Sequence, residues 1–137
     1  MAKDKRFLTQ AIHNKKICLK IDELKEFQDW VITTAFYSAL HFVKYKIFPY
    51  TSPDDPSKIY KNLEEYKDDN PDLKNMGISN HAILNNLVSK ELPKIYGDYK
   101  YLYDFSMKAR YNFYKMKQEY CDFIIHELKK IENNCII

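Results

Sequence analysis

The chain has 137 residues, 45% of them hydrophobic and 30% charged, which is the size and composition of one soluble globular domain. Its net charge of +3 is too small to indicate a dedicated nucleic-acid groove, although a local basic patch stays open. Only two glycines are present, which disfavours a domain rich in β-turns. We therefore predict a single helical domain that spans residues 1–137.

Two long helices are predicted at the start of the chain. The first covers residues 4–20, where apolar residues recur at helical spacing and lysines gather near the C-terminal end. Asp22 can serve as the N-cap of a second helix, which runs from about Glu23 to Phe48 and stops at Pro49. This helix is apolar nearly all round, so we expect other helices to cover it on more than one side. Its polar interruptions exclude a membrane span.

Shorter helices are predicted in the middle of the chain. One covers about residues 58–67, and the polar residues 68–79 follow it as the most loop-like segment. Ser79 or Asn80 can cap a further helix over about residues 81–91.

Two more long helices complete the predicted fold. After a break at Pro93, one runs to about Tyr111, and its regular part is expected to begin at Asp98 because Gly97 is unfavourable inside a helix. The last covers about residues 114–132. Its expected core line is Cys121, Ile124, Leu128 and Ile131. The predicted fold class is therefore all-α, an up-and-down helical bundle of four main helices plus one or two short helices.

A line of polar residues interrupts the apolar second helix. Thr34, Ser38, His41 and Tyr45 follow one another at spacings of four and three, so they share one face, with Tyr37 beside them. A buried polar group without a partner costs about 1–3 kcal/mol. These side chains therefore either find hydrogen-bond partners within the core or face a wet cleft, and the sequence leaves both interpretations open.

The helix that ends near Tyr111 carries a second line of interest. It consists of Tyr96, Lys100, Tyr103, Met107, Arg110 and Tyr114. Arg110 is one of only two arginines in a chain with twenty lysines, and a guanidinium can make bidentate contacts to a carboxylate or phosphate. The alternative interpretations are a surface salt bridge and a cation at a helix C-terminus. The tyrosines suit packing first and base stacking second.

The remaining candidate residues give little support for metal or cofactor chemistry. His81 opens a helix after a polar loop, where a side chain commonly faces a cleft, whereas His13 and His126 lie among charged residues and are expected to be solvated. The three cysteines lack metal-ligand spacing, and no nucleotide-binding glycine loop occurs. We expect no metal and no cofactor. The odd number of cysteines and the lack of a signal peptide favour the cytoplasm.

Three segments of the sequence resemble the HEPN superfamily, especially its small stand-alone members. They are TAFYSALH in residues 34–41, NH at residues 80–81 and IYGDYKYLYDFSMKARY in residues 95–111, and the resemblance extends over about residues 25–132. It implies a helical bundle that dimerises. Catalytic members are metal-independent ribonucleases, in which an arginine and a histidine about four to six residues apart meet their symmetry mates in the dimer cleft. The ribose 2′-hydroxyl attacks the adjacent phosphate, while the histidine transfers protons and the arginine holds the phosphate.

The sequence departs from this pattern where the catalytic histidine is expected. After Arg110, the corresponding positions hold Lys115, Met116 and Lys117, and none of these side chains can replace an imidazole as a proton carrier near neutral pH. The departure favours binding over cleavage.

Two main hypotheses follow. In the first, the chain is a HEPN-like homodimer that binds RNA, a nucleotide or a partner protein through a polar cleft around Arg110, without the standard catalytic motif. The residues expected to line that cleft are Tyr37, Ser38, Tyr103, Tyr111 and Tyr114. In the second, it is a divergent endoribonuclease of toxin or antiviral type, in which His41 or His81 acts with Arg110. A purely structural interaction domain is a third possibility, and none of the three involves a membrane.

Overall fold

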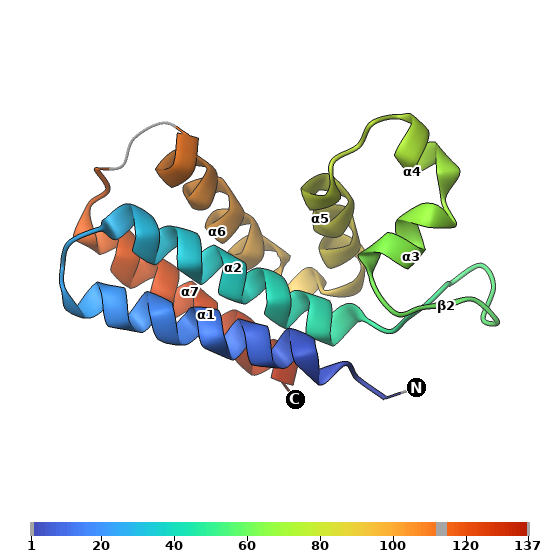
Figure 1. The fold of residues 1–137 in the computed structure, drawn as a ribbon, viewed down its shortest axis with the longest axis horizontal. Coiled ribbons are helices and arrows are strands. Elements are labelled where there is room, and N and C mark those ends of the chain that lie inside the picture. The colour runs from blue at the N-terminus through green and yellow to red at the C-terminus, as the bar shows by residue number, and fades with distance from the viewer. Residues whose placement is uncertain (1, 112–114, 137) are drawn as a thin grey trace.

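The computed structural model describes residues 2–111 and 115–136, and four long helices dominate it (Figure 1). They are α1 (Lys5–Glu23), α2 (Gln28–Ile47), α6 (Pro93–Tyr111) and α7 (Gln118–Ile136). Successive members of this set pack alongside one another, and α2 contacts each of the other three. The prediction of an all-α up-and-down bundle is confirmed. In the part of the chain that the structure describes, each helix is too short or too polar to cross a membrane.

The core forms around α2 because this helix has apolar side chains on nearly every side. Ile32, Phe36 and Val43 are completely buried, and α2 packs against α1, α6 and α7. The hydroxyl of Ser38 is also buried, and it donates a 2.7 Å hydrogen bond to the Ala11 carbonyl oxygen of α1. Burial of apolar area on several sides of one helix therefore holds the bundle together.

Shorter elements fill the segment between α2 and α6. The strands β1 (Tyr50–Thr51) and β2 (Ile59–Tyr60) pair as an antiparallel hairpin. The short helices α3 (Leu63–Asp68) and α4 (Pro71–Asn75) follow, and then the longer α5 (Asn80–Glu91). These elements lie together at the end of the molecule that carries the hairpin (Figure 1).

Two predictions for this middle segment are wrong. The expected helix over residues 58–67 is divided between β2 and α3, because the Asn62 side chain accepts a hydrogen bond from the Glu65 backbone N–H and starts the helix there. The expected loop over residues 68–79 contains α4, which begins at Pro71. By contrast, the predicted helix near residues 81–91 is confirmed, with Ser79 as its N-cap.

The boundary between the first two helices also differs from the prediction. Asp22 is not a cap but a residue of the last turn of α1, and α2 begins only at Gln28. The intervening turn contains two non-glycine residues in the left-handed region, Lys25 with φ 53° and Phe27 with φ 51°. This conformation costs roughly 1–2 kcal/mol for an L-residue. The turn is therefore a strained connection between two well-packed helices.

The boundaries of α6 and α7 also shift from their predicted places. Helix α6 begins at Pro93 rather than Asp98, because proline is well suited to the first helical position and nothing crowds Gly97. Asp98 instead faces Glu127 of α7, and burial together with a hydrogen bond that the protonated Asp98 carboxyl donates to the Glu127 carboxylate raises the pKa of Asp98 to about 6. Helix α7 continues to Ile136, and its predicted start at residue 114 lies outside the described residues. Its predicted core line is confirmed, since all four members are buried.

The strained turn gives a test of the fold. Replacement of Lys25 by Gly should raise the free energy of unfolding by about 0.5–1 kcal/mol, because glycine adopts positive φ without a steric penalty. Glu26→Gly is the matched control, since Glu26 has no positive φ and the change adds only backbone entropy to the unfolded state. Urea denaturation measures both. A loss of stability in Lys25→Gly as large as that in Glu26→Gly would contradict the assigned turn geometry.

Candidate functional site

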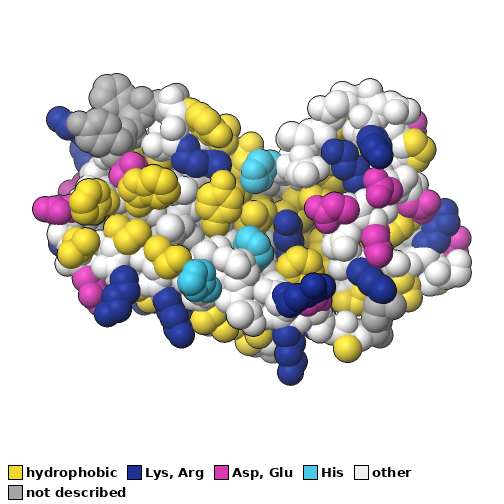
Figure 2. Space-filling view, in the orientation of Figure 1, with side chains coloured by type: hydrophobic (Ala, Val, Ile, Leu, Met, Phe, Trp, Pro, Cys, Tyr) yellow, Lys and Arg dark blue, Asp and Glu magenta, His cyan; other side chains and the backbone are white. Residues whose placement is uncertain are grey.

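The surface is hollowed between α5 and α6, and histidine side chains lie at the floor of this hollow and on the surface below it (Figure 2). We call the hollow the notch. Between the two helices that border it, the His81 ring of α5 lies 5.7 Å from the Tyr103 ring of α6, centroid to centroid. Both rings also contact Phe36 of α2, at 5.8 Å from His81 and 5.6 Å from Tyr103. Three helices thus contribute one aromatic layer.

The Arg110 side chain is fixed against this layer by neutral groups. Its Nη1 donates a 2.7 Å hydrogen bond to the Tyr37 hydroxyl of α2, and its Nε donates to the Ser106 carbonyl oxygen at 3.3 Å. Its Nη2 lies 3.4 Å from both the Ser106 hydroxyl and the Met107 sulfur. The guanidinium carbon lies 5.4 Å from the Tyr37 ring centroid and 5.8 Å from that of Phe36. We refer to Arg110, Tyr37, Phe36, His81 and Tyr103 as the Arg110 cluster.

The charge of Arg110 is not neutralised by an acid. Within residues 2–111 and 115–136, no carboxylate forms an ion pair with this half-buried guanidinium. Burying a cation is unfavourable unless a counter-charge accompanies it. The cluster is therefore electrostatically prepared for an anion.

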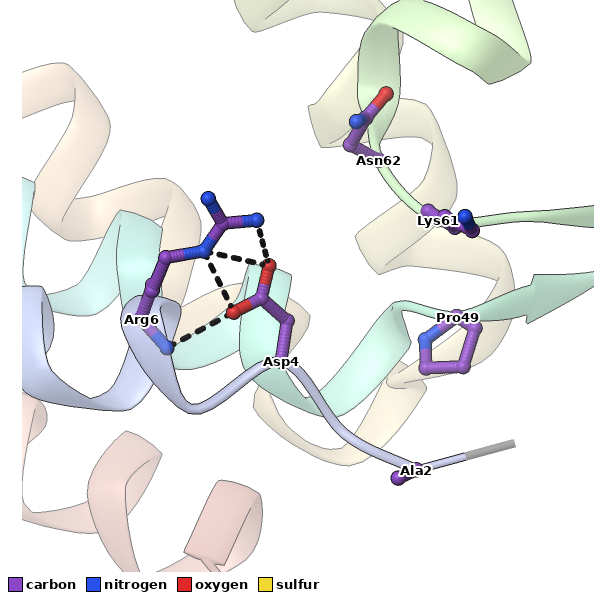
Figure 3. Close-up of a pocket in the computed structure, with 6 residues that line it drawn as sticks. All are labelled: Ala2, Asp4, Arg6, Pro49, Lys61 and Asn62. Carbon is purple, nitrogen blue, oxygen red and sulfur yellow. Dashed lines mark hydrogen bonds and ion pairs between the residues drawn. The ribbon is translucent and has the colours of Figure 1, made fainter.

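The other arginine has the opposite environment. Arg6 is highly exposed and donates to both carboxylate oxygens of Asp4, at distances between 2.8 and 3.2 Å (Figure 3). The pair lines a pocket of about 270 Å³, with Lys61 and Asn62 on its far side. Because Asp4 already supplies the negative charge, this guanidinium gains less from a bound anion than Arg110 does.

Positive charges lie near two histidines of the site. Arg110 and Lys44 act on His81, and Lys44 acts on His41. Burial lowers the pKa of His81, and the positive charges of Arg110 and Lys44 lower it further. Burial also lowers the pKa of His41, helped by Lys44 and opposed by the Tyr37 carbonyl oxygen, which lies 2.9 Å from Nδ1. Both imidazoles are therefore mainly neutral at pH 7. A neutral imidazole can accept a proton, and a bound anion would favour that step.

The polar residues along α2 have two different environments. Thr34 and Ser38 form hydrogen bonds within the bundle, whereas His41 lies beside the Arg110 cluster. Thr34 bonds back to the Trp30 carbonyl oxygen at 2.7 Å, and Ser38 is buried against α1. The structure therefore does not bring Ser38 into the notch with the other expected ligand-binding residues. His41 is half-buried and contacts the backbone of Tyr37, so it borders the cluster.

The predicted tyrosines differ in their positions. Tyr103 lies in the aromatic layer, whereas Tyr111 is 70% exposed, with its ring centroid 5.3 Å from the Arg110 guanidinium carbon. Tyr111 therefore lies at the rim of the cluster. Tyr114 falls outside the described residues.

One charged residue near the site was missed by the sequence analysis. Lys44 influences both histidines and lies three residues after His41, on the same side of α2. Helical spacing from His41 could have identified it.

The described residues offer neither a metal-binding group nor a reactive thiol. No set of three histidine, cysteine, aspartate or glutamate side chains in residues 2–111 and 115–136 is placed to hold a metal ion. Burial raises the pKa of Cys18 to about 11 and the pKa values of Cys121 and Cys135 to about 12. All three thiols are therefore protonated at neutral pH and poor nucleophiles. The chemistry available at the notch is anion binding and proton transfer.

The histidine environment predicts a pH-dependent loss of stability. The folded-state pKa values of His41 and His81 lie below those of an unfolded chain, so the unfolded state takes up protons first as the pH falls below about 6.5. The stability present above that pH is then lost. A variant with both His41→Gln and His81→Gln should lose less stability between pH 7 and pH 5, as measured by urea denaturation. The exposed His13→Gln is the control, and equal slopes in all three proteins would contradict the assigned environments.

Comparison of the chain with family models, curated proteins and solved structures gives no match in any of the three. The resemblance to the HEPN superfamily therefore rests on the three sequence segments described above, in residues 34–41, 80–81 and 95–111. A functional conclusion has to come from the geometry of the Arg110 cluster.

Proposed function

We propose that this chain is a HEPN-like homodimer that binds RNA or a nucleotide through its phosphate at the Arg110 cluster, without the standard catalytic motif. The observation that carries the proposal is a half-buried guanidinium whose hydrogen-bond partners, within residues 2–111 and 115–136, are all neutral groups. Such a group is positioned before the ligand arrives and gains its counter-charge from the ligand. A phosphate matches the planar donor geometry of arginine.

Neighbouring groups add to the attraction for an anion. Lys44 is close enough to lower the pKa values of both His41 and His81, so its charge also acts on the site. Helix α5 begins at Asn80 without an acidic residue in its first turn, which leaves its partial positive charge near His81 uncompensated. These positive contributions favour phosphate over a neutral ligand.

Aromatic side chains around the phosphate position suit the rest of a nucleotide. Tyr111 is exposed beside Arg110, and Tyr103 and Tyr37 lie in or beside the aromatic layer. Bases stack on tyrosine faces with little dependence on sequence. A carboxylate-bearing partner protein would use the guanidinium but not the aromatic surface, so we favour RNA or a nucleotide.

Binding of a short fluorescent oligoribonucleotide tests the proposal. Arg110→Ala should weaken binding by about ten- to a hundred-fold, because a charge-assisted contact contributes about 1.5–3 kcal/mol. Affinity should also fall as salt rises, since the contact is ionic. Arg6→Ala is the matched control and should leave binding nearly unchanged, because Asp4 already pairs with that guanidinium.

Two results would contradict the proposal. Equal affinities of the Arg110→Ala variant and the wild type would remove the cluster from binding. A strictly monomeric protein in sedimentation analysis, at all workable concentrations, would contradict the dimer.

A metal-independent ribonuclease is the second candidate function. The specific observation in its favour is that burial, and then the positive charges of Arg110 and Lys44, lower the pKa of His81, so that its mainly neutral imidazole could accept a proton from a ligand held by Arg110. His81 would remove the proton from the 2′-hydroxyl as its oxygen bonds to phosphorus, the bond from phosphorus to the 5′-oxygen of the next nucleotide would break, and the protonated imidazole would return the proton to that leaving oxygen. The arginine would stabilise the charge that develops on the phosphate.

Cleavage of RNA in the presence of EDTA distinguishes this candidate from binding alone. If the chain is a nuclease, both Arg110→Ala and His81→Gln should abolish the reaction, while His126→Gln, on the exposed side of α7, retains it. Full activity in His81→Gln would exclude His81 as the base. Absence of cleavage in the wild type, together with retained binding, would leave the first function.

A further inference from the structure

One line of side chains on α2 stays open to solvent. Between residues 31 and 43, only Thr34, Tyr37 and His41 are not buried. Lys44 comes next and is half-buried. These four residues recur at spacings of three and four, so they share one face of the helix, and we call them the α2 strip. Because other helices cover the remaining sides of α2, the strip is its accessible part along these turns.

Positive charges lie at two separate places along the α2 strip. Arg110 of α6 donates its 2.7 Å hydrogen bond to the Tyr37 hydroxyl. Further along is Lys44, and no carboxylate among residues 2–111 and 115–136 forms an ion pair with it. The Lys44 charge acts on His41 within the strip and on His81 of α5, in both cases by lowering the pKa of the imidazole. Lys44 is therefore a second cation near the notch without a counter-charge.

The two cations are too far apart to share one phosphate. Tyr37, which holds Arg110, and Lys44 are seven residues apart, so a rise of about 1.5 Å per residue separates them by about 10 Å along the axis of α2. Helical side chains lean towards the N-terminus of their helix, which shifts both polar ends in the same direction and keeps roughly this separation. A phosphate at Arg110 therefore leaves Lys44 unpaired, whereas a nucleic-acid strand carries a further phosphate for it.

We propose that the α2 strip binds the backbone of a single-stranded RNA, with one phosphate at Arg110 and a later phosphate of the same strand at Lys44. The inference rests on the proposed function and selects a strand over a mononucleotide as the ligand. A backbone that follows the strip meets a cation at each of these places. Its bases are left to stack on exposed tyrosines such as Tyr111, which lies beside Arg110.

His41 lies on the strip between the two phosphate positions and favours a ribose there. Its Nδ1 is 2.9 Å from the Tyr37 carbonyl oxygen. Since a carbonyl oxygen only accepts, Nδ1 carries the proton, and in the neutral imidazole Nε2 is the acceptor. A ribose 2′-hydroxyl is a suitable donor to Nε2, and this hydroxyl is what distinguishes RNA from DNA.

A purely structural role of Lys44 gives a different expectation. Lys44 lies in the last turn of α2, where a cation stabilises the helix dipole. That role needs no ligand, so removal of the charge would lower the stability of the fold and leave the affinity for RNA unchanged. Binding and stability measured on one variant therefore separate the two roles.

The experiment measures binding of inorganic phosphate, uridine 5′-monophosphate, oligouridylate and oligodeoxyuridylate of equal length to the full-length protein by calorimetry. Lys44→Gln removes the second cation. Lys16→Gln is the matched control, because Lys16 is an exposed lysine of α1 outside the strip. Urea denaturation of each variant gives its stability.

Lys44→Gln should bind oligouridylate about three- to ten-fold more weakly than the wild type does, the loss expected for one hydrogen bond. The slope of log affinity against log salt should also fall by about 0.7 in magnitude, the value for one phosphate contact on a single strand. Phosphate and uridine 5′-monophosphate should bind Lys44→Gln and the wild type equally. Oligodeoxyuridylate should bind the wild type more weakly than oligouridylate does.

Each outcome has a defined meaning. Unchanged oligouridylate affinity in Lys44→Gln overturns the inference, and so does an equal loss in Lys16→Gln. If Lys44→Gln weakens phosphate as much as oligouridylate, both cations hold one phosphate, and this inference fails while the proposed function stands. Equal affinities for the two oligomers overturn the assignment of RNA. If the wild type binds none of the four ligands, the proposed function fails as well.

Discussion

The bundle depends on burial of α2 from several sides at once. Because this helix has no extended polar face, it is stable only when α1, α6 and α7 cover it, and each of these helices turns its apolar residues inward to do so. Phe36 shows how far this constraint extends, since its ring contacts four other rings and the Arg110 guanidinium. A residue of the hydrophobic core is therefore also the floor of the candidate site.

The same constraint explains why a charged group can be held without an acid. Tyr37 follows Phe36 on α2, and its hydroxyl accepts a hydrogen bond from Arg110 across the interface with α6. Ser106, one turn before Arg110, supplies two further acceptors. These neutral contacts fix the orientation of the guanidinium but leave its charge uncompensated. The arrangement favours an incoming anion over an internal salt bridge, because the geometry is already set when the anion arrives.

The sequence was informative where a strong periodicity or a single capping residue decides the structure. It predicted the core helix α2, the buried line of α7, the Ser79 cap and a bundle of four main helices. It failed where tertiary contacts override local preference. Ser38 has the spacing of a cleft residue, but it faces a carbonyl oxygen of α1, and no pattern within α2 reveals that neighbour. Asp98 has the properties of a cap, but α6 already begins at Pro93, so Asp98 lies inside the helix and faces Glu127 of α7.

The three protected thiols make the bundle sensitive to its own opening motions. Cys18, Cys121 and Cys135 lie in α1 and α7, and all three are buried with pKa values far above neutrality. Alkylating reagents can reach them only when these two helices separate from α2. The rate of thiol alkylation at neutral pH therefore measures how often α1 and α7 separate from α2. It reports local opening of the bundle on the side away from the notch.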